Sequence, residues 1–335
     1  MSDATSALYV RSDEVDGLLT PAEYVDAVRE GYRDRGNGAP AEPRTALFND
    51  DPAGMLTGYM AILPTVGAMG SYTYAAGFGD QDAHFLLPLF DAESGRPTAV
   101  LDGASLNPFK TGATGAVAVD ELARPEASSV AVFGSGPQAR GQLRATATVR
   151  ELDAVSVYSP TESHRTAFAA EMDDRLDAAV SAVRSPPDAL SGADIVITAT
   201  DATEPVFDGD DLEAGTHVTA MGQYHPRHRE IDAETVARAT YVPDLRARIH
   251  QDAGAFIQAR EAGLVEDEHV HAELGDVVVG ERPGRTDADE ITLFDSGGTA
   301  IETVAAGARI EEQARARGLG ETIEMSPASL ALTGK

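Results

Sequence analysis

The sequence predicts an α/β protein with a doubly wound parallel sheet and a second, α+β domain. Two observations predict this fold class. Beyond about residue 116, short apolar runs alternate with helix-like segments, the pattern of a parallel sheet covered by helices. Before that point the apolar runs are broken by Gly, Pro and Asp, which is typical of antiparallel strands with accompanying helices.

The first domain is expected to open with a helix over LLTPAEYVDAVREGYRDRG. Thr20 can cap it, Pro21 suits its first turn and Glu23 completes a capping box. One face then carries Val25, Val28 and Tyr32. Further along, HFLLPLFDAESGRPTAVLDG predicts two strands around a turn that contains glycine.

The parallel sheet is expected to begin with a buried strand over residues 130–133. A glycine turn, a helix and a second strand at 154–158 follow it. The alternation continues through ADIVITAT, GTHVTAMG and ATYVPD, and EITLFDSGG leads from a last strand into a long helix. Such repeated β and α units predict parallel strands.

Charge is the most unusual feature of the composition, with 55 acidic residues against 26 basic ones and a net charge of −29. A surface of this kind repels itself unless salt screens it, which indicates an intracellular protein of a salt-loving, haloarchaeal type. It disfavours nucleic acid and anionic membranes as partners. The chain has no cysteine, no apolar run near the ~18 residues of a membrane span and no signal-peptide pattern, so we expect a cytoplasmic protein without a metal site.

The glycine turn after residue 133 carries the strongest local motif. Gly134, Gly136 and Ala139 form GxGxxA between a strand and a helix, the setting in which this pattern binds a dinucleotide. The first glycine permits the tight turn and the second lets the backbone approach the pyrophosphate at the helix N-terminus. The residues between them, Ser135, Pro137 and Gln138, are expected to take part. The sequence thus predicts a Rossmann-type cofactor domain.

The end of the second strand indicates which cofactor is bound. NAD-specific sites usually carry Asp or Glu there, whereas this chain has Ser159 and Thr161, with Arg165 close behind. Hydroxyl groups and a nearby arginine suit a 2′-phosphate. NADP is therefore favoured, and Glu162 leaves NAD open.

With these motifs placed, the chain resembles the ornithine cyclodeaminase/mu-crystallin family, which includes archaeal alanine dehydrogenases and ketimine reductases. The matching stretches include LFDAESGRPTAVLDG, KTGATGAVAVDELARPEASSVAVFGSGPQARGQL and LGDVVVGERPGRTDADEITLFDSGGTAIETVAA. The resemblance covers about residues 20–310. It implies a homodimer in which residues 1–115 and 300–335 bind substrate and dimerise, and residues 116–299 bind the cofactor.

The resemblance also implies site residues. Arg44 and Lys110 would hold a substrate carboxylate, with Lys110 in the place of a family arginine. Tyr72 stands where a lysine contacts substrate, and Tyr224, followed by His225, stands where cyclodeaminases carry a proton-accepting Asp. The matching stretches place five more residues at the cofactor: Thr111, Thr200, Met221, Gly222 and Asp295.

Lys110 supports a separate argument, because it and the C-terminal Lys335 are the only lysines. Asn107 is expected to cap a helix that Pro108 opens, which puts Lys110 in the first turn. A cation there opposes the helix dipole unless an anion lies beside it. The alternative is a lysine tolerated at the surface.

Three functions remain open from the sequence. The leading hypothesis is an oxidoreductase that transfers hydride between NAD(P) and a small amino-acid-like substrate, with Tyr72, Tyr224 and His225 as candidates for proton transfer. A cyclodeaminase that releases ammonia with bound NAD is the second. It is disfavoured because loss of a general base costs about 10²–10⁴-fold in rate. The third is a non-catalytic, NADP-linked binding protein.

Overall fold

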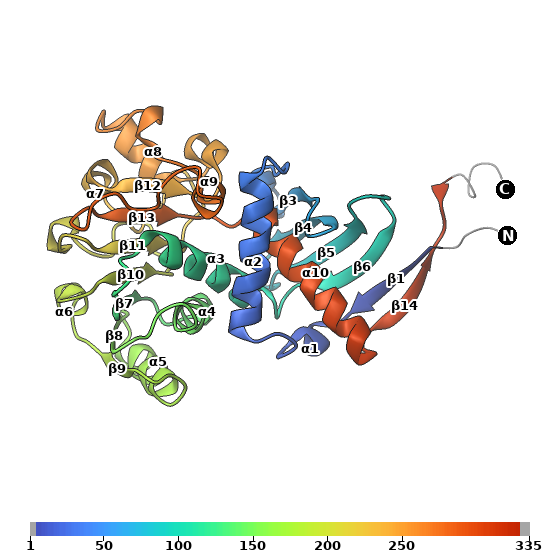
Figure 1. Cartoon of the computed structure of the whole chain (residues 1–335), viewed down its shortest axis with the longest axis horizontal. Helices are drawn as coiled ribbons and strands as arrows, with labels where there is room; N and C mark the ends of the chain where they lie inside the picture. Colours follow the sequence, from blue (N-terminus) through green and yellow to red (C-terminus); the bar gives the residue numbers. More distant parts are fainter. Residues whose placement is uncertain (1–4, 329–335) are drawn as a thin grey trace. The chain divides into compact units, whose positions relative to one another are not determined.

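The computed structural model describes residues 5–328, which fall into two compact units (Figure 1). The first unit combines the chain up to Asn107 with the chain from Thr299 onward, and the second spans Pro108–Gly298. The sequence-based boundary near residue 115 falls inside helix α3 (Asn107–Leu122). The roles assigned to the two regions stay a prediction. Each unit is described by itself below.

The first unit is built on one sheet in the order β14-β1-β6-β5-β4-β3-β2. Strands β1 and β6 run parallel, and the other neighbouring strands are antiparallel. The elements are β1 (Thr5–Val10), α1 (Ser12–Val15), α2 (Pro21–Gly36), β2 (Thr45–Asp50), β3 (Ala53–Leu63), β4 (Ala68–Ala76), β5 (His84–Asp91), β6 (Pro97–Asp102), α10 (Ala300–Arg317) and β14 (Glu321–Met325). Helix α10 packs on β3, β4 and β5 and against α2, so the core of this unit lies between sheet and helices (Figure 1).

Helix α2 begins as the sequence predicts. The Thr20 hydroxyl accepts a hydrogen bond from the backbone N–H of Glu23 at 3.3 Å, and the Glu23 carboxylate accepts one from the backbone N–H of Thr20 at 2.7 Å. Val28 and Tyr32 on its apolar face are fully buried. The capping box and the buried face are therefore confirmed.

The second unit is an α/β layer structure with a parallel sheet in the order β12-β13-β11-β10-β7-β8-β9. Its strands are β7 (Ser129–Phe133), β8 (Ala154–Tyr158), β9 (Ala179–Ala182), β10 (Ile195–Thr198), β11 (His217–Ala220), β12 (Thr240–Pro243) and β13 (Thr292–Asp295). The order departs from β7 in both directions, so the switch point of a doubly wound sheet lies between β7 and β10. In such sheets ligands bind at the carboxyl ends of the strands near this point. The predicted fold class is confirmed.

Helices and short helical turns connect these strands. They are α3, α4 (Pro137–Thr146), α5 (Glu162–Asp173), α6 (Pro186–Leu190), η1 (Gly209–Asp211), α7 (Ala233–Arg238), η2 (Arg246–His250), α8 (Gly254–Glu261), η3 (Asp267–His269) and α9 (Leu274–Val278). Side chains alternate across each strand, so Ala131 and Phe133 join one core while Val130 and Val132 join the core on the opposite face. Among the helices of residues 5–328, none has both the length and the apolar composition for a bilayer crossing.

Helices α3 and α4 approach each other through glycine. A Cβ on Gly112 would collide with the backbone of Gly141, and a Cβ on Gly141 would collide with the carbonyl group of Pro108. The glycine of the KTG stretch therefore has a packing role: it brings the first turns of α3 against α4, the helix that follows the glycine turn.

Candidate active site

The turn between β7 and α4 has the geometry that a pyrophosphate requires. Gly134 has a φ of 115°, and a Cβ there would collide with the carbonyl oxygen of Ala199, so the position requires glycine. Gly136 is the N-cap of α4, so no capping side chain covers the first backbone N–H groups of the helix. No atom lies within 4 Å of the place that a Cβ on Gly136 would occupy. The start of α4 thus presents backbone N–H groups next to open space. A dinucleotide phosphate fits this arrangement.

The neighbouring residues of the turn also fit a cofactor. The Ser135 hydroxyl lies 3.2 Å from that of Ser159, and Pro137 opens the helix. The Oε1 atom of Gln138 is buried without a hydrogen-bond partner among the described residues. Ala139 is fully buried where helix packs on strand. The strand, turn and helix are as predicted, and binding by these side chains stays a prediction.

The end of β8 carries the residues predicted to select the cofactor. Ser159 is buried, and Thr161 precedes α5 as its N-cap without a side-chain capping bond. Arg165 reaches back from α5, and its Nη1 donates to the carbonyl oxygens of Ser159 at 3.1 Å and Pro160 at 3.3 Å. The guanidinium therefore lies at the strand end where a cofactor ribose is bound in such sheets.

Glu230 joins the loops that follow β10 and β11. Its carboxylate accepts hydrogen bonds from the backbone N–H and the hydroxyl of Thr200, both at 2.7 Å, and from the backbone N–H of Gly222 at 2.7 Å. The hydroxyl of Thr198 donates a fourth at 2.9 Å. Complete burial raises the pKa of Glu230, while these four donors favour the ionised form. Two predicted cofactor residues, Thr200 and Gly222, are thus held by one carboxylate.

Gln142 on α4 connects two other predicted cofactor residues. Its Nε2 lies 2.7 Å from the sulfur of Met221 and donates to the carbonyl oxygen of Thr111 at 3.4 Å. Both Met221 and Thr111 are buried. Thr200 follows β10, and Met221 and Gly222 follow β11, so these three predicted cofactor residues lie in two neighbouring loops at the carboxyl edge of the sheet.

Lys110 is buried, with 2% of its surface exposed. Helix α3 begins at Asn107, which was expected to precede the helix as its cap and is instead its first residue. Lys110 is the fourth residue of the helix, in its first turn as predicted. The alternative of a surface lysine is wrong, because the side chain is enclosed. A buried ammonium group is stable only with anionic or hydrogen-bonding neighbours, as the dipole argument also requires.

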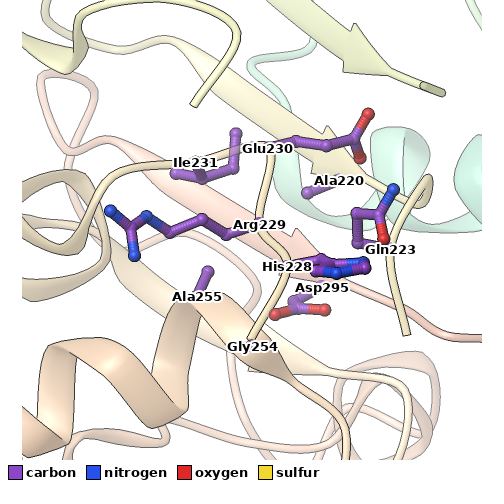
Figure 2. A pocket seen from close by; sticks show the side chains of 9 residues that line it. All are labelled: Ala220, Gln223, His228, Arg229, Glu230, Ile231, Gly254, Ala255 and Asp295. Atoms are coloured by element: carbon purple, nitrogen blue, oxygen red, sulfur yellow. The ribbon is translucent and has the colours of Figure 1, made fainter. Parts of the chain in front are cut away.

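A small pocket lies beyond the ends of β11 and β13 (Figure 2). It is lined by Ala220, Gln223, His228, Arg229, Glu230, Ile231, Gly254, Ala255 and Asp295. Asp295, predicted as a cofactor residue, is buried, and burial raises its pKa while Arg248 opposes that effect. Figure 2 shows His228 and Asp295 reaching toward the same pocket.

Tyr224 and His225, the predicted proton-transfer pair, lie outside this lining. Tyr224 is 42% exposed. The His225 ring stacks on that of His228 at 4.2 Å, and its Nδ1 accepts a hydrogen bond from the backbone N–H of Arg227 at 3.1 Å. Desolvation, then the charges of His228 and Arg227, lower the pKa of His225. His228, which belongs to the same YHPRHRE stretch after β11, is the histidine that lines the pocket.

Arg44 and Tyr72 belong to the first unit, in an aromatic cluster on its sheet. Arg44 is buried, its Nη1 donates to the hydroxyl of Tyr74, and its guanidinium lies 4.9 Å from the ring centre of Tyr59. Tyr72 is fully buried; its hydroxyl donates to the carbonyl oxygen of Gly103 at 3.0 Å, and burial raises its pKa. This packing is that of a core tyrosine, and its role in proton transfer stays a prediction.

Comparisons with known proteins identify the family to which the chain belongs. The model of the family described as "Ornithine cyclodeaminase/mu-crystallin family" matches residues 7–318. A Delta(1)-pyrroline-2-carboxylate reductase of Bacillus cereus is 34% identical over 73% of this chain and 76% of that protein. The structure of Delta(1)-pyrroline-2-carboxylate reductase from Thermococcus litoralis, in complex with NADH and L-proline, superposes with a TM-score of 0.88 at 30% identity over 94% of this chain and 100% of that one.

An archaeal alanine dehydrogenase, a dimer with bound NAD, superposes with a TM-score of 0.87 at 30% identity, over 95% of this chain and 99% of that one. These matches extend over both units of the chain and over the stretches in which the resemblance was seen. The chain therefore belongs to the ornithine cyclodeaminase/mu-crystallin family.

Proposed function

We propose that the protein is an NAD(P)-dependent oxidoreductase that transfers hydride between the nicotinamide cofactor and a small imino or amino acid. The observation that carries this is the Gly134–Pro137 turn, which presents the start of α4 to open space. Support comes from relatives that are a pyrroline-2-carboxylate reductase and an alanine dehydrogenase. A cyclic or linear imine is reduced to an amine, or the amine is oxidised in reverse.

When bound, the nicotinamide supplies or accepts the hydride. The chain does the rest: the turn after β7 binds the phosphates, and Glu230 orients the loops of Thr200 and Gly222. Lys110 and Arg44, each a buried cation in its own unit, are the proposed ligands of a substrate carboxylate. Reduction of an imine also consumes one proton at nitrogen, and the sequence offers Tyr72, Tyr224 and His225 as candidates for supplying it.

The finer preference for NADP rests on the end of β8. Ser159 and Thr161 carry hydroxyl groups where an acid would repel a 2′-phosphate, and Arg165 lies at the same strand end. A guanidinium binds phosphate oxygens by strong, charge-assisted hydrogen bonds. We therefore expect a higher kcat/KM with NADPH than with NADH.

A homodimer is proposed from an apolar face on the sheet of the first unit. Large apolar side chains on one face of β2, β3 and β5 are 40–66% exposed: Leu47, Leu56, Met60, Ile62 and Leu86. Leu47 and Leu56 pair directly across β2 and β3. An apolar patch of this extent on a surface with net charge −29 indicates an interface. Sedimentation in molar salt should give a dimer, and Met60→Glu should give monomer; a wild-type monomer would contradict the proposal.

The acidic surface supports a cytoplasmic location in a cell with high internal salt. Repulsion among the excess carboxylates falls as salt shortens the screening length. The midpoint of thermal unfolding should therefore rise steeply between low and molar KCl. A midpoint independent of KCl would remove this part of the proposal.

The experiment that tests the function uses the purified full chain in molar KCl with NADPH or NADH. The substrates are Δ1-pyrroline-2-carboxylate, Δ1-piperideine-2-carboxylate, and pyruvate with ammonia, and cofactor absorbance is followed. Oxidation of the cofactor supports the oxidoreductase. Ammonia release from ornithine without net cofactor change would instead support the lyase, and cofactor binding with no turnover would support the binding protein.

A further inference from the structure

A buried ionic cluster surrounds Arg248 in the second unit. Arg248 is 1% exposed and contacts three carboxylates. Its Nε lies 2.7 Å from Asp252, its Nη1 lies 3.0 Å from Asp244, and the same Nη1 lies 3.5 Å from the side chain of Asp295. It also donates to the backbone carbonyl of Asp295 at 3.2 Å. One guanidinium therefore joins the residues that follow β12 to the last residue of β13.

The cluster fixes the turn after β13. The second oxygen of Asp244 accepts hydrogen bonds from the Ser296 hydroxyl at 2.6 Å and from the backbone N–H groups of Gly297 and Gly298, both at 3.2 Å. A Cβ on Gly297 would lie 2.6 Å from Nη2 of Arg248, so glycine lets the guanidinium lie against the backbone. The DSGG stretch, which the sequence allowed as a simple strand-to-helix turn, is thus held by a buried salt bridge.

Asp295 is held on both of its carboxylate oxygens. Its Oδ2 accepts a hydrogen bond from the hydroxyl of Tyr241 on β12 at 2.8 Å, and its Oδ1 faces Arg248. The residue also lines the pocket that His228 lines (Figure 2). Three carboxylates against one guanidinium leave excess negative charge in a buried place, which favours a proton on one of them. Asp295 is the member of the three that lines the pocket.

We propose that Tyr241 and Arg248 are positioning residues for Asp295: they hold its carboxyl group at the pocket and set the pH at which this end of the site changes charge. This inference rests on the proposed function, since it assigns a pH response to that same site. The charged and titratable groups around Asp295 are Tyr241 on β12, Asp244, Arg248 and Asp252 after β12, and His228, Arg229 and Glu230 on the loop after β11.

The strand order separates the pocket at Asp295 from the glycine turn that is proposed to bind the cofactor phosphates. In the sheet, β11 and β10 lie between β13, which carries Asp295, and β7, which leads into the glycine turn. A change in the charge of Asp295 should therefore alter turnover more than it alters the KM for the cofactor, because the phosphates are bound at the other end. A general loss of structure would instead affect both.

Two substitutions near Asp295 should shift the pKa of its carboxyl group in opposite directions. Tyr241→Phe keeps the ring packed on Phe256 and removes a hydrogen bond that favours the ionised carboxylate. Asp252→Asn removes a negative charge that disfavours the ionised form and leaves an amide oxygen for Arg248. The acidic limb of the kcat–pH profile should move to higher pH in Tyr241→Phe, by about one unit, the size expected for one hydrogen bond to a charged group. It should move to lower pH in Asp252→Asn.

Two further variants sharpen the test. Arg248→Lys keeps the charge but loses the guanidinium fork, so its limb should move in the direction of Tyr241→Phe. Thr240→Val is the matched control. It removes a hydroxyl from the end of β12 that lies away from Asp295, where Thr240 donates a hydrogen bond to Glu290 at 2.8 Å. Its pH profile should match that of the wild type. Unshifted profiles in both Tyr241→Phe and Asp252→Asn would overturn the inference.

A direct titration separates this inference from the proposed function. Carboxyl ¹³C resonances of the full chain can be followed against pH, with Asp295→Asn assigning the Asp295 signal. If no imine is turned over, the function fails, yet the Asp295 midpoint should still rise in Tyr241→Phe and fall in Asp252→Asn. Equal midpoints in all three proteins would overturn the inference even in an active enzyme.

Discussion

The carboxylate of Glu230 accepts a hydrogen bond from the backbone N–H of Gly222 at 2.7 Å, within the loop that follows β11. The same side chain holds the backbone and hydroxyl of Thr200. The carboxylate accepts in each of these hydrogen bonds, so an ionised group suits the place. The shape of the proposed cofactor site at the ends of β10 and β11 therefore depends on one buried side chain.

Glu230→Gln tests this dependence. The amide NH₂ would face hydrogen-bond donors, and leaving a buried donor unsatisfied costs about 1–3 kcal/mol. Cofactor affinity should fall on the order of 10-fold, with a lower midpoint of thermal unfolding. Glu204→Gln is the control, since it loses an exposed ion pair with Arg229 of little energetic value. Fluorescence titration with NADPH measures the affinity, and equal affinity in Glu230→Gln and the wild type would refute the role.

Two alanine variants distinguish fold from binding in the glycine turn. Gly134→Ala should unfold at lower temperature, because φ is 115° and the new Cβ collides with Ala199. Gly136→Ala should fold normally, because φ is −84° and no atom lies within 4 Å of the new Cβ. It should nevertheless bind cofactor more weakly, since the methyl group fills space meant for the pyrophosphate. Normal cofactor binding by Gly136→Ala would contradict this placement.

Arg165→Gln tests the cofactor preference. Losing a charge-assisted hydrogen bond costs about 1.5–3 kcal/mol, which corresponds to a KM for NADPH raised by about 10-fold or more. The KM for NADH should hardly change, because that cofactor has no 2′-phosphate. Steady-state kinetics with each cofactor gives the ratio. An equal rise for both cofactors would mean that Arg165 acts through the β8–α5 connection and not on the phosphate.

His217 makes stability depend on pH. It is fully buried between the hydroxyls of Thr219 and Thr292, both at 2.9 Å, and burial lowers its pKa from 6.5 to about 3. The unfolded chain binds a proton below pH 6.5 that the fold excludes, so this contribution is complete above pH 6.5 and declines as pH falls toward 3.

The size of this effect can be measured by denaturant unfolding in molar salt. Between pH 7 and pH 5, His217 should account for about 2 kcal/mol of lost stability. The variant His217→Gln should lose less over the same interval, while the carboxylates contribute equally to both proteins. An identical loss in the two proteins would show that His217 is not the group responsible.

The parts of the fold that the sequence predicted are those set by local pattern. The Thr20 cap and strand β8 depend on residues close together in the chain. Strands β1 and β14 were not predicted, because they pair with each other from opposite ends of the chain and have no turn between them. Strand β9 was missed because it is short and largely exposed, so it lacks a buried apolar run.

The candidate site shows the same division. The glycine turn was predictable because GxGxxA sits between a strand and a helix within one short stretch. Glu230, Tyr241 and Arg248 were not singled out, because each is defined by partners on other strand ends. A signal was present for Glu230: it lies in the loop after β11, at the carboxyl edge where such sheets bind ligands. Its role becomes visible only when β10 and β11 lie side by side.

The measurement that tests the central claim most directly is the oxidation of NADPH by the full chain in molar KCl with Δ1-pyrroline-2-carboxylate, followed by absorbance. The account predicts turnover that is lost in Gly136→Ala at cofactor concentrations that saturate the wild type, with L-proline as the product. A cofactor-binding protein that leaves NADPH unchanged with this imine, with Δ1-piperideine-2-carboxylate and with pyruvate plus ammonia would contradict it.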